Sequence, residues 1–199
     1  LQRRYGFDGI LVNLPGRRPD WRAAVTRVEE RDGQQVLVWS NGWYTEVPPD
    51  DNPHVYQADG TRYFPTFDEV DPEQLFYVEP HDLAGVTYPC WWSFGGERAI
   101  PGPDFFPPWH HDTIKAVVDR AGRDVSVHGE VFSPFSQFME MLDYTNGLMA
   151  LMDDAGRCEA MLDRFAEGAA VLGRLQLRAG ADAVLISSAF TGAGLISRE

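Results

Sequence analysis

The runs VSVHGEV, residues 125–131, and AVLISS, residues 183–188, decide the fold of this chain. Both are short and apolar, both stop on small or polar residues, and a helical pattern at residues 159–179 separates them. A strand, a helix and a second strand in this order predict two parallel strands, a helix over one face and a right-handed crossover. We therefore expect the chemistry of this α/β unit where its strands end.

The connection between these two strands is predicted to be helical. Pro134 suits the first turn of a helix, where its missing N–H group costs nothing. Apolar residues at helical spacing predict helices at residues 135–142, 148–153 and 159–179, and Gly180 ends the last of them. A further helix, before the first strand of the unit, is predicted to end at Gly122.

The N-terminal part combines a buried strand with an antiparallel insertion. The sequence GFDGILVNLP, residues 6–15, contains a buried-strand run at residues 10–12 that ends at Asn13. Residues 23–64 then show a period of two with Asp-Gly and Asn-Gly turns, which is typical of a β-meander. The predicted strands are residues 25–30, 35–39 and 43–47, followed by a further hairpin at residues 55–58 and 62–64. We interpret its aromatic residues as cross-strand packing in preference to a ligand platform.

Residues 65–109 are rich in proline, acidic and aromatic residues. So many aromatic side chains predict an ordered segment, with short helices at residues 72–77 and 81–92, and a long loop of this kind is usually a lid or a pocket wall. His110, His111 and Asp112 follow, and these residue types bind metals. Adjacent helical residues point about 100° apart, so we interpret the three as a helix start in preference to a metal site.

The composition excludes several classes of function. The chain has 199 residues, 17 Lys and Arg against 30 Asp and Glu, and a formal charge of -13, so we expect no nucleic-acid partner. Cys90 and Cys158 have no partner at metal spacing, which favours a reducing, cytoplasmic setting. No apolar run approaches the ~20 residues that span a bilayer, so no membrane role is expected.

Two stretches resemble one known family. The run GEVFSPFSQF at residues 129–138, followed after a long helix by RAGADAVLISSAFTGAGLIS at residues 178–197, is similar to the uroporphyrinogen decarboxylase superfamily. This superfamily also contains cobamide-dependent methyltransferases. The opening GFDGILVNLPG resembles its second barrel strand, and the middle of the chain is less specific. The resemblance implies a (β/α)8 barrel whose chemistry lies at the C-terminal ends of its strands.

On this resemblance the chain is one incomplete barrel domain, about strands two to four. It begins at Leu1 and ends on Ser197, Arg198 and Glu199, which reads as the start of a helix, so we expect a fragment that is inactive alone. One pocket is expected to hold Asn13, Glu130, Ser187 and Ser188, with Phe132, Ser133 and Gln137 lining it as substrate-binding residues. We expect a small-molecule substrate, and the oligomeric state is not predicted.

Three positions depart from the decarboxylase pattern. Gly9 stands where the second strand of decarboxylases carries an aspartate, Glu140 where they carry a substrate-binding tyrosine, and Ala189 where a serine follows the fourth strand. Decarboxylase substrates bear many carboxylates, which need Arg or Lys, and the predicted strand ends offer neither. The meander after the second strand is more similar to the methyltransferase branch.

We therefore expect methyl transfer linked to a corrinoid protein. The first alternative is uroporphyrinogen decarboxylation, and the second alternative is a non-catalytic ligand-binding barrel. The methyltransferase resemblance implies zinc and a cobamide for the full-length protein, but no metal ligands can be identified in this chain. Glu130 is the predicted proton donor or hydrogen-bond acceptor, and a structural acid that caps the next helix is an equal alternative. Asn13 is either a second catalytic contact or a turn residue.

Overall fold

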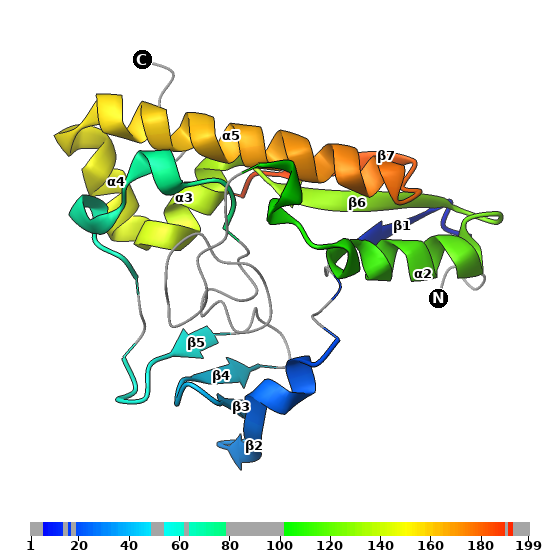
Figure 1. Ribbon diagram of the computed structural model, residues 1–199, viewed down its shortest axis with the longest axis horizontal. Helices are drawn as coiled ribbons and strands as arrows, with labels where there is room; N and C mark the ends of the chain where they lie inside the picture. Colours follow the sequence, from blue (N-terminus) through cyan, green and yellow to red (C-terminus); the bar gives the residue numbers. More distant parts are fainter. Residues whose placement is uncertain are drawn as a thin grey trace.

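The computed structural model describes residues 6–13, 16, 19–48, 54–61, 64–78, 102–189 and 191–192. The strands of these residues form two sheets, one parallel and one antiparallel (Figure 1). The parallel sheet lies with the long helices, and the antiparallel sheet projects away from them. The chain is therefore a mixed α/β protein.

The parallel sheet has the strand order β1-β6-β7. Its strands are β1, Gly9–Val12; β6, Ser126–Phe132; and β7, Ala183–Ser187. Gly9 lies opposite Ser126 in one parallel pair, and Glu130 lies opposite Leu185 in the other. The predicted strand, helix, strand unit is thus confirmed. The buried strand predicted at residues 10–12 adds to the same sheet.

Three helices connect β6 to β7, and α2, Asp112–Ala121, directly precedes β6. The three are α3, Pro134–Leu142; α4, Tyr144–Asp153; and α5, Ala155–Arg178. α4 and α5 begin four residues before their predicted starts at residues 148 and 159. The carboxylate of Asp143 accepts a hydrogen bond from the N–H of Tyr144, and that of Asp154 accepts one from the N–H of Arg157, each in the first turn of its helix. Capping therefore starts each helix before its first apolar residue.

β6 divides the parallel sheet into two faces. Val127, Gly129 and Val131 are buried, and the residues between them are half-buried. Val127 packs with Ile114 of α2, and Val131 joins a larger core with residues of α3 and α5. Each such aliphatic side chain contributes about 1.5–3 kcal/mol by its burial. The helices thus cover one face, and Ser126, His128, Glu130 and Phe132 belong to the other.

The antiparallel sheet has the order β2-β3-β4-β5. Its strands are β2, Val25–Arg31; β3, Gln34–Trp39; β4, Tyr44–Val47; and β5, His54–Tyr56. Asp32 and Gly33 both have positive φ, 51° and 79°, as a two-residue hairpin turn requires. The predicted meander is confirmed, and β5 extends it by pairing with β4.

The hairpin predicted after β5 is only partly described. Its first arm belongs to β5, and the chain then turns, with the N–H of Gln57 donating to the carbonyl of Thr61 at 2.8 Å. The carboxylate of Asp59 accepts from the N–H of Thr61 inside this turn. Residues 62 and 63 of the predicted second arm lie outside the described residues.

Residues 64–78, which we call the returning segment, lie along α5. The guanidinium of Arg157 donates to the carbonyls of Phe67 and Val70, and Arg164 donates to that of Leu75. Gly168 admits the carbonyl oxygen of Phe76, which would lie 1.8 Å from a Cβ at this position. The helix predicted at residues 72–77 is shortened to a 3-10 turn, Pro72–Gln74, because these contacts hold an extended segment after it. The helix predicted at residues 81–92 lies outside the described residues.

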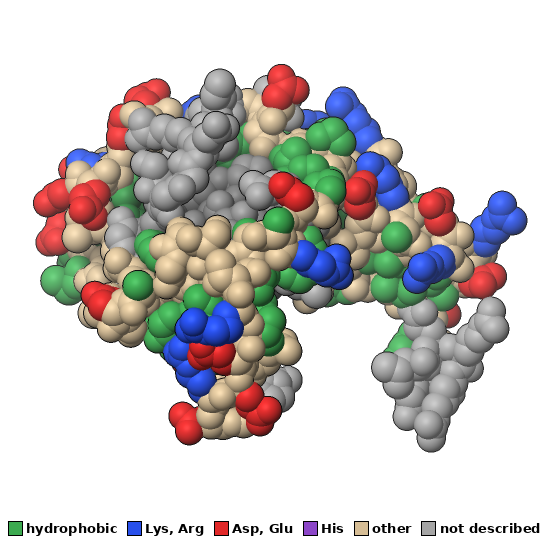
Figure 2. All heavy atoms as spheres, turned by 60° about the horizontal axis from the view of Figure 1, so that its bottom comes forward, with side chains coloured by type: hydrophobic (Ala, Val, Ile, Leu, Met, Phe, Trp, Pro, Cys, Tyr) green, Lys and Arg blue, Asp and Glu red, His purple; other side chains and the backbone are tan. Residues whose placement is uncertain are grey.

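The surface of the described residues is mixed in charge. Acidic and basic side chains are interspersed on the face shown in Figure 2. None of the described helices is both long enough and apolar enough to cross a membrane.

Candidate active site

The C-terminal ends of β1, β6 and β7 lie next to one another. Phe132 of β6 is opposite Ser187 of β7, and Glu130 is opposite Leu185. The pairing of β1 with β6 ends at Val12 opposite Gly129, so the next step of the register places Asn13 beside Glu130. The sheet thus brings together the residues predicted at three strand ends. Their roles in catalysis stay predictions.

A network of hydroxyl groups joins the ends of β6 and β7. Ser133, the N-cap of α3, lies with its Oγ 2.9 Å from the Oγ of Ser188 and 3.1 Å from that of Ser136. Thr191 donates from Oγ1 to Ser188 at 3.0 Å. Hydroxyl groups both donate and accept, so this cluster can hydrogen-bond either a neutral or an anionic substrate group. Ser133 is itself buried, and Ser188 is half-buried.

Gln137 lies beneath this network and is fully buried. Its Oε1 accepts from the N–H of Val78 at 3.0 Å, and its Nε2 donates to the carbonyl of Phe132 at 2.9 Å. The amide therefore ties the segment that returns along α5 to the end of β6. Its predicted contact with substrate is untested, and this structural tie was not predicted from the sequence.

Gln176 of α5 supports the backbone of Glu130. Its Nε2 donates to the carbonyl of Glu130 at 2.7 Å, beyond the point where β1 stops pairing with β6. A Cβ on Gly129 would lie 2.3 Å from Gln176 Oε1, so only glycine leaves room for this amide. The sequence alone gave no signal for Gln176, because a single glutamine in an amphipathic helix usually faces solvent.

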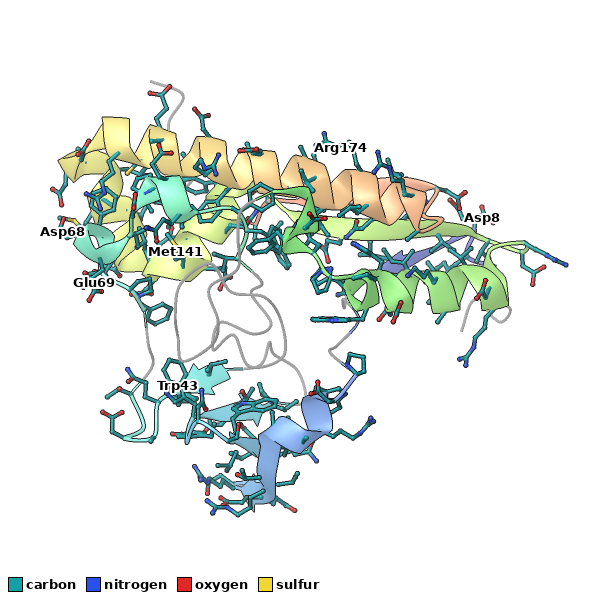
Figure 3. All side chains as sticks on the ribbon, viewed as in Figure 1. Asp8, Trp43, Asp68, Glu69, Met141 and Arg174 are labelled. Carbon is teal, nitrogen blue, oxygen red and sulfur yellow. The ribbon has the colours of Figure 1, made fainter. Side chains whose placement is uncertain are left out.

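A second row of hydrogen-bonded polar side chains, Ser126, His128 and Asp182, lies nearer the N-terminal end of β6. The Oγ of Ser126 is 2.9 Å from Nε2 of His128 and 3.4 Å from Oδ2 of Asp182. The same Oδ2 accepts from the N–H of Val127 at 2.8 Å. Asp182 directly precedes β7, so this carboxylate joins the starts of two neighbouring strands. Asp8, labelled in Figure 3, marks the same end of the sheet.

Two adjacent histidines are buried before α2. His110 is 5 % exposed and His111 is 6 % exposed, and the ring of His110 packs against Phe106. Burial, with a smaller contribution from the neighbouring His111, lowers the pKa of His110 to about 3. Burial also lowers the pKa of His111. The predicted helix start is confirmed in position, and the two rings belong to the packed interior.

The described residues do not form a metal centre. Among them no three His, Cys, Asp or Glu side chains gather closely enough to hold an ion. Cys158 is buried, and its burial raises the pKa of the thiol, which opposes the thiolate that zinc needs. The described residues therefore do not fit a zinc site.

An apolar groove lies on the opposite face of the sheet. It has a volume of about 400 Å³ between α5 and the outer sides of β6 and β7, where Val131, Val184 and Ile186 line it together with Arg174 (Figure 3). Because Glu130 belongs to the other face of β6, this groove is separate from the candidate active site.

The structure locates the three positions that depart from the decarboxylase pattern. Gly9 begins β1 and lies at the N-terminal end of the sheet, opposite Ser126 and far along the strand from Asn13. Glu140 lies in α3, and Ala189 is exposed just after β7. A side chain at position 9 would therefore meet His128 and would not reach the strand ends.

Comparison with known proteins gives one match. A family model described as Uroporphyrinogen decarboxylase (URO-D) matches residues 99–199, which are 101 of the 199 residues. The matched part contains β6, β7 and helices α2 to α5, and it leaves out β1 and the antiparallel sheet. No curated protein and no solved structure matches the chain.

Proposed function

Because the chain belongs to the uroporphyrinogen decarboxylase family, we propose that it is an enzyme that transfers methyl groups together with a corrinoid protein. Three neighbouring parallel strands with helices on one face are what one part of a (β/α)8 barrel looks like. On this proposal β1, β6 and β7 are about strands two to four of such a barrel, and the antiparallel sheet is an insertion in it.

The choice between the two reactions rests on the charged side chains at the described strand ends. The described residues there offer one carboxylate, an amide and several hydroxyl groups, but neither Lys nor Arg, at residues 13, 130–133 and 187–189. A porphyrinogen with many carboxylates needs cationic partners, and arginine is the usual one. The neutral hydroxyl cluster therefore supports a small substrate with few charges.

Each strand-end residue has a proposed role. Glu130 exchanges a proton or accepts a hydrogen bond from the substrate, and Asn13 contacts the same reacting group from β1. The substrate-binding residues are Phe132, Ser133, Ser187 and Ser188. Gln137, which is fully buried, positions this site by its hydrogen bond to the carbonyl of Phe132. The corrinoid of the partner protein supplies the methyl group. No step is assigned to zinc, because the described residues do not fit it.

The experiment is a methyl-transfer assay of the full-length protein with methylcobamide and a small thiol. We expect a thioether product, and Glu130→Gln should lower kcat by about 10²–10⁴-fold, as loss of a general acid or base does. Glu159→Gln is the matched control because this glutamate is exposed on α5, away from the strand ends. Its kcat should equal that of the wild type.

The alternative is decarboxylation of uroporphyrinogen, the reaction after which the matching family is named. Turnover of uroporphyrinogen without methyl transfer would establish this reaction and reject ours. Ligand binding with neither activity would establish a non-catalytic barrel.

A further inference from the structure

The hydrogen bonds around His128 favour one position for the proton of its ring. A carboxylate only accepts hydrogen bonds, so the hydroxyl of Ser126 donates its hydrogen bond to Oδ2 of Asp182, 3.4 Å away. The Oγ of Ser126 must then accept from His128, whose Nε2 lies 2.9 Å away. This arrangement favours the Nε2–H tautomer of His128, which leaves Nδ1 as a proton acceptor.

The free nitrogen belongs to the same face as the candidate active site. His128 and Glu130 are two residues apart on β6, so their side chains point to the same side about 6.6 Å apart along the strand. Among the described residues Nδ1 has no hydrogen-bond partner. On β7 the residue opposite His128 is the small Ala183, and on β1 it is Leu11, with Gly9 diagonally beyond it. The half-buried imidazole and Glu130 thus lie on one face of β6, within reach of a single substrate.

We propose that His128 is a further acid–base residue of this site, which accepts a proton at Nδ1 while Ser126 and Asp182 hold its tautomer. The inference rests on the proposed methyl transfer. In that reaction the S–H bond of the acceptor thiol breaks, an S–CH₃ bond forms, and the electron pair of the donor–methyl bond stays with the donor. The thiol proton goes to Nδ1 and then to solvent.

The arrangement follows the general form of an activated base. An imidazole whose other nitrogen is held by a third group keeps one tautomer and one orientation, which is the principle of the catalytic triad. Several charged groups lie near His128. Glu130 is on the same face of β6, and the N-terminal end of the strand carries Asp8, Asp124, Asp182 and Arg123.

The first test does not depend on activity. Full-length protein labelled with ¹⁵N-histidine is examined by NMR at a pH where the imidazole is neutral, and the His128 signals are assigned with His128→Gln. We expect the Nε2–H tautomer. In Asp182→Asn the new amide can donate to Ser126, which then donates to Nε2, so the tautomer should reverse to Nδ1–H. Asp124→Asn, which removes a nearby carboxylate that does not contact Ser126, should leave the tautomer unchanged.

The second test is the pH dependence of methyl transfer. His128→Gln should lose about 10²-fold or more in kcat together with one limb of the pH profile, and added imidazole should restore part of the rate. A purely structural histidine would not be rescued in this way. An Nδ1–H tautomer in the wild type, or a variant with an unchanged pH profile, would overturn the proposal. If the wild type transfers no methyl group, the proposed function fails, while the tautomer experiment still decides how His128 is held.

Discussion

The two sheets of this protein are stabilised by contacts of very different range. In the antiparallel sheet the side-chain hydrogen bonds span short stretches of sequence, from Asn41 with the N–H of Trp43 to Thr26 with the carbonyl of Val38. Around the parallel sheet and its helices, several of them join residues much farther apart in the sequence, such as Gln137 with Val78 and Gln176 with Glu130. The first sheet can therefore form from local sequence, whereas the candidate active site exists only when α3, α5 and the returning segment have packed against β6.

The largest expected effect is a loss of stability in acid, which we expect from the buried His110 beside the parallel sheet. The folded protein keeps His110 neutral because burial lowers its pKa to about 3, whereas the unfolded chain binds a proton near pH 6.5. The free energy of unfolding should therefore fall as the pH drops from 6.5 towards 3, by at most about 5 kcal/mol from this group. Urea unfolding at several pH values measures the slope.

His110→Gln should flatten this slope between pH 6.5 and 3. Thr45→Val, in the antiparallel sheet, is the control and should keep it. Equal slopes in the wild type and His110→Gln would show that this ring does not control acid stability.

Close packing between α5 and the returning segment gives the next effect. In Gly168→Ala the new Cβ would lie 1.8 Å from the carbonyl oxygen of Phe76, so the segment must move away from α5. We expect a loss of about 3 kcal/mol in the free energy of unfolding. Gly173→Ala is the matched change in the same helix, since its Cβ would only touch Val184 at 3.8 Å.

The control should gain about 0.5–1 kcal/mol, because alanine is the better helix former. Guanidinium unfolding measures both. A Gly168→Ala protein as stable as Gly173→Ala would mean that the returning segment is not held against α5.

The buried glutamine below the hydroxyl network gives a smaller effect. Gln137→Leu leaves the N–H of Val78 and the carbonyl of Phe132 without these partners, at a cost of about 2 kcal/mol. Backbone hydrogen exchange should become faster at Val78 while β2 and β3 keep their protection. Unchanged exchange at Val78 would contradict the long-range character of this contact.

The smallest effect belongs to the antiparallel sheet. The indole Nε1 of Trp39 donates to the Oγ1 of Thr45 at 2.7 Å inside its buried face. Thr45→Val removes the acceptor and should cost about 1 kcal/mol, because the indole N–H is then buried without a partner. Trp39 fluorescence should change, and the kcat of methyl transfer should not. A lowered kcat would show that the two sheets are coupled.

The sequence predicted the local parts of this fold better than the long-range ones. Alternating residues with Asp32-Gly33 and Asn41-Gly42 turns predicted β2 to β4 closely, and the apolar run near Ile10 predicted β1. The pairing of β5 with β4 and the extended course of residues 75–78 were missed, because partners distant in the sequence decide both.

The candidate site shows the same division. Polar residues that end apolar runs predicted Asn13, Glu130 and Ser187, since the ends of parallel strands necessarily lie together. Gln176 was missed because its place depends on the missing side chain of Gly129. His128 was missed because Ser126 and Asp182 come together only when β6 and β7 pair.

The tight turn at Asp32 and Gly33 offers a position for attaching a tag to the antiparallel sheet. Both residues are exposed, and the side-chain hydrogen bonds of this sheet are largely its own. A short epitope or a fluorescent reporter inserted at this tip would stay clear of Glu130 and His128. A surface tethered there would leave the strand ends accessible, so the proposed binding of a corrinoid protein could be tested on the immobilised protein without blocking the mouth of the proposed barrel.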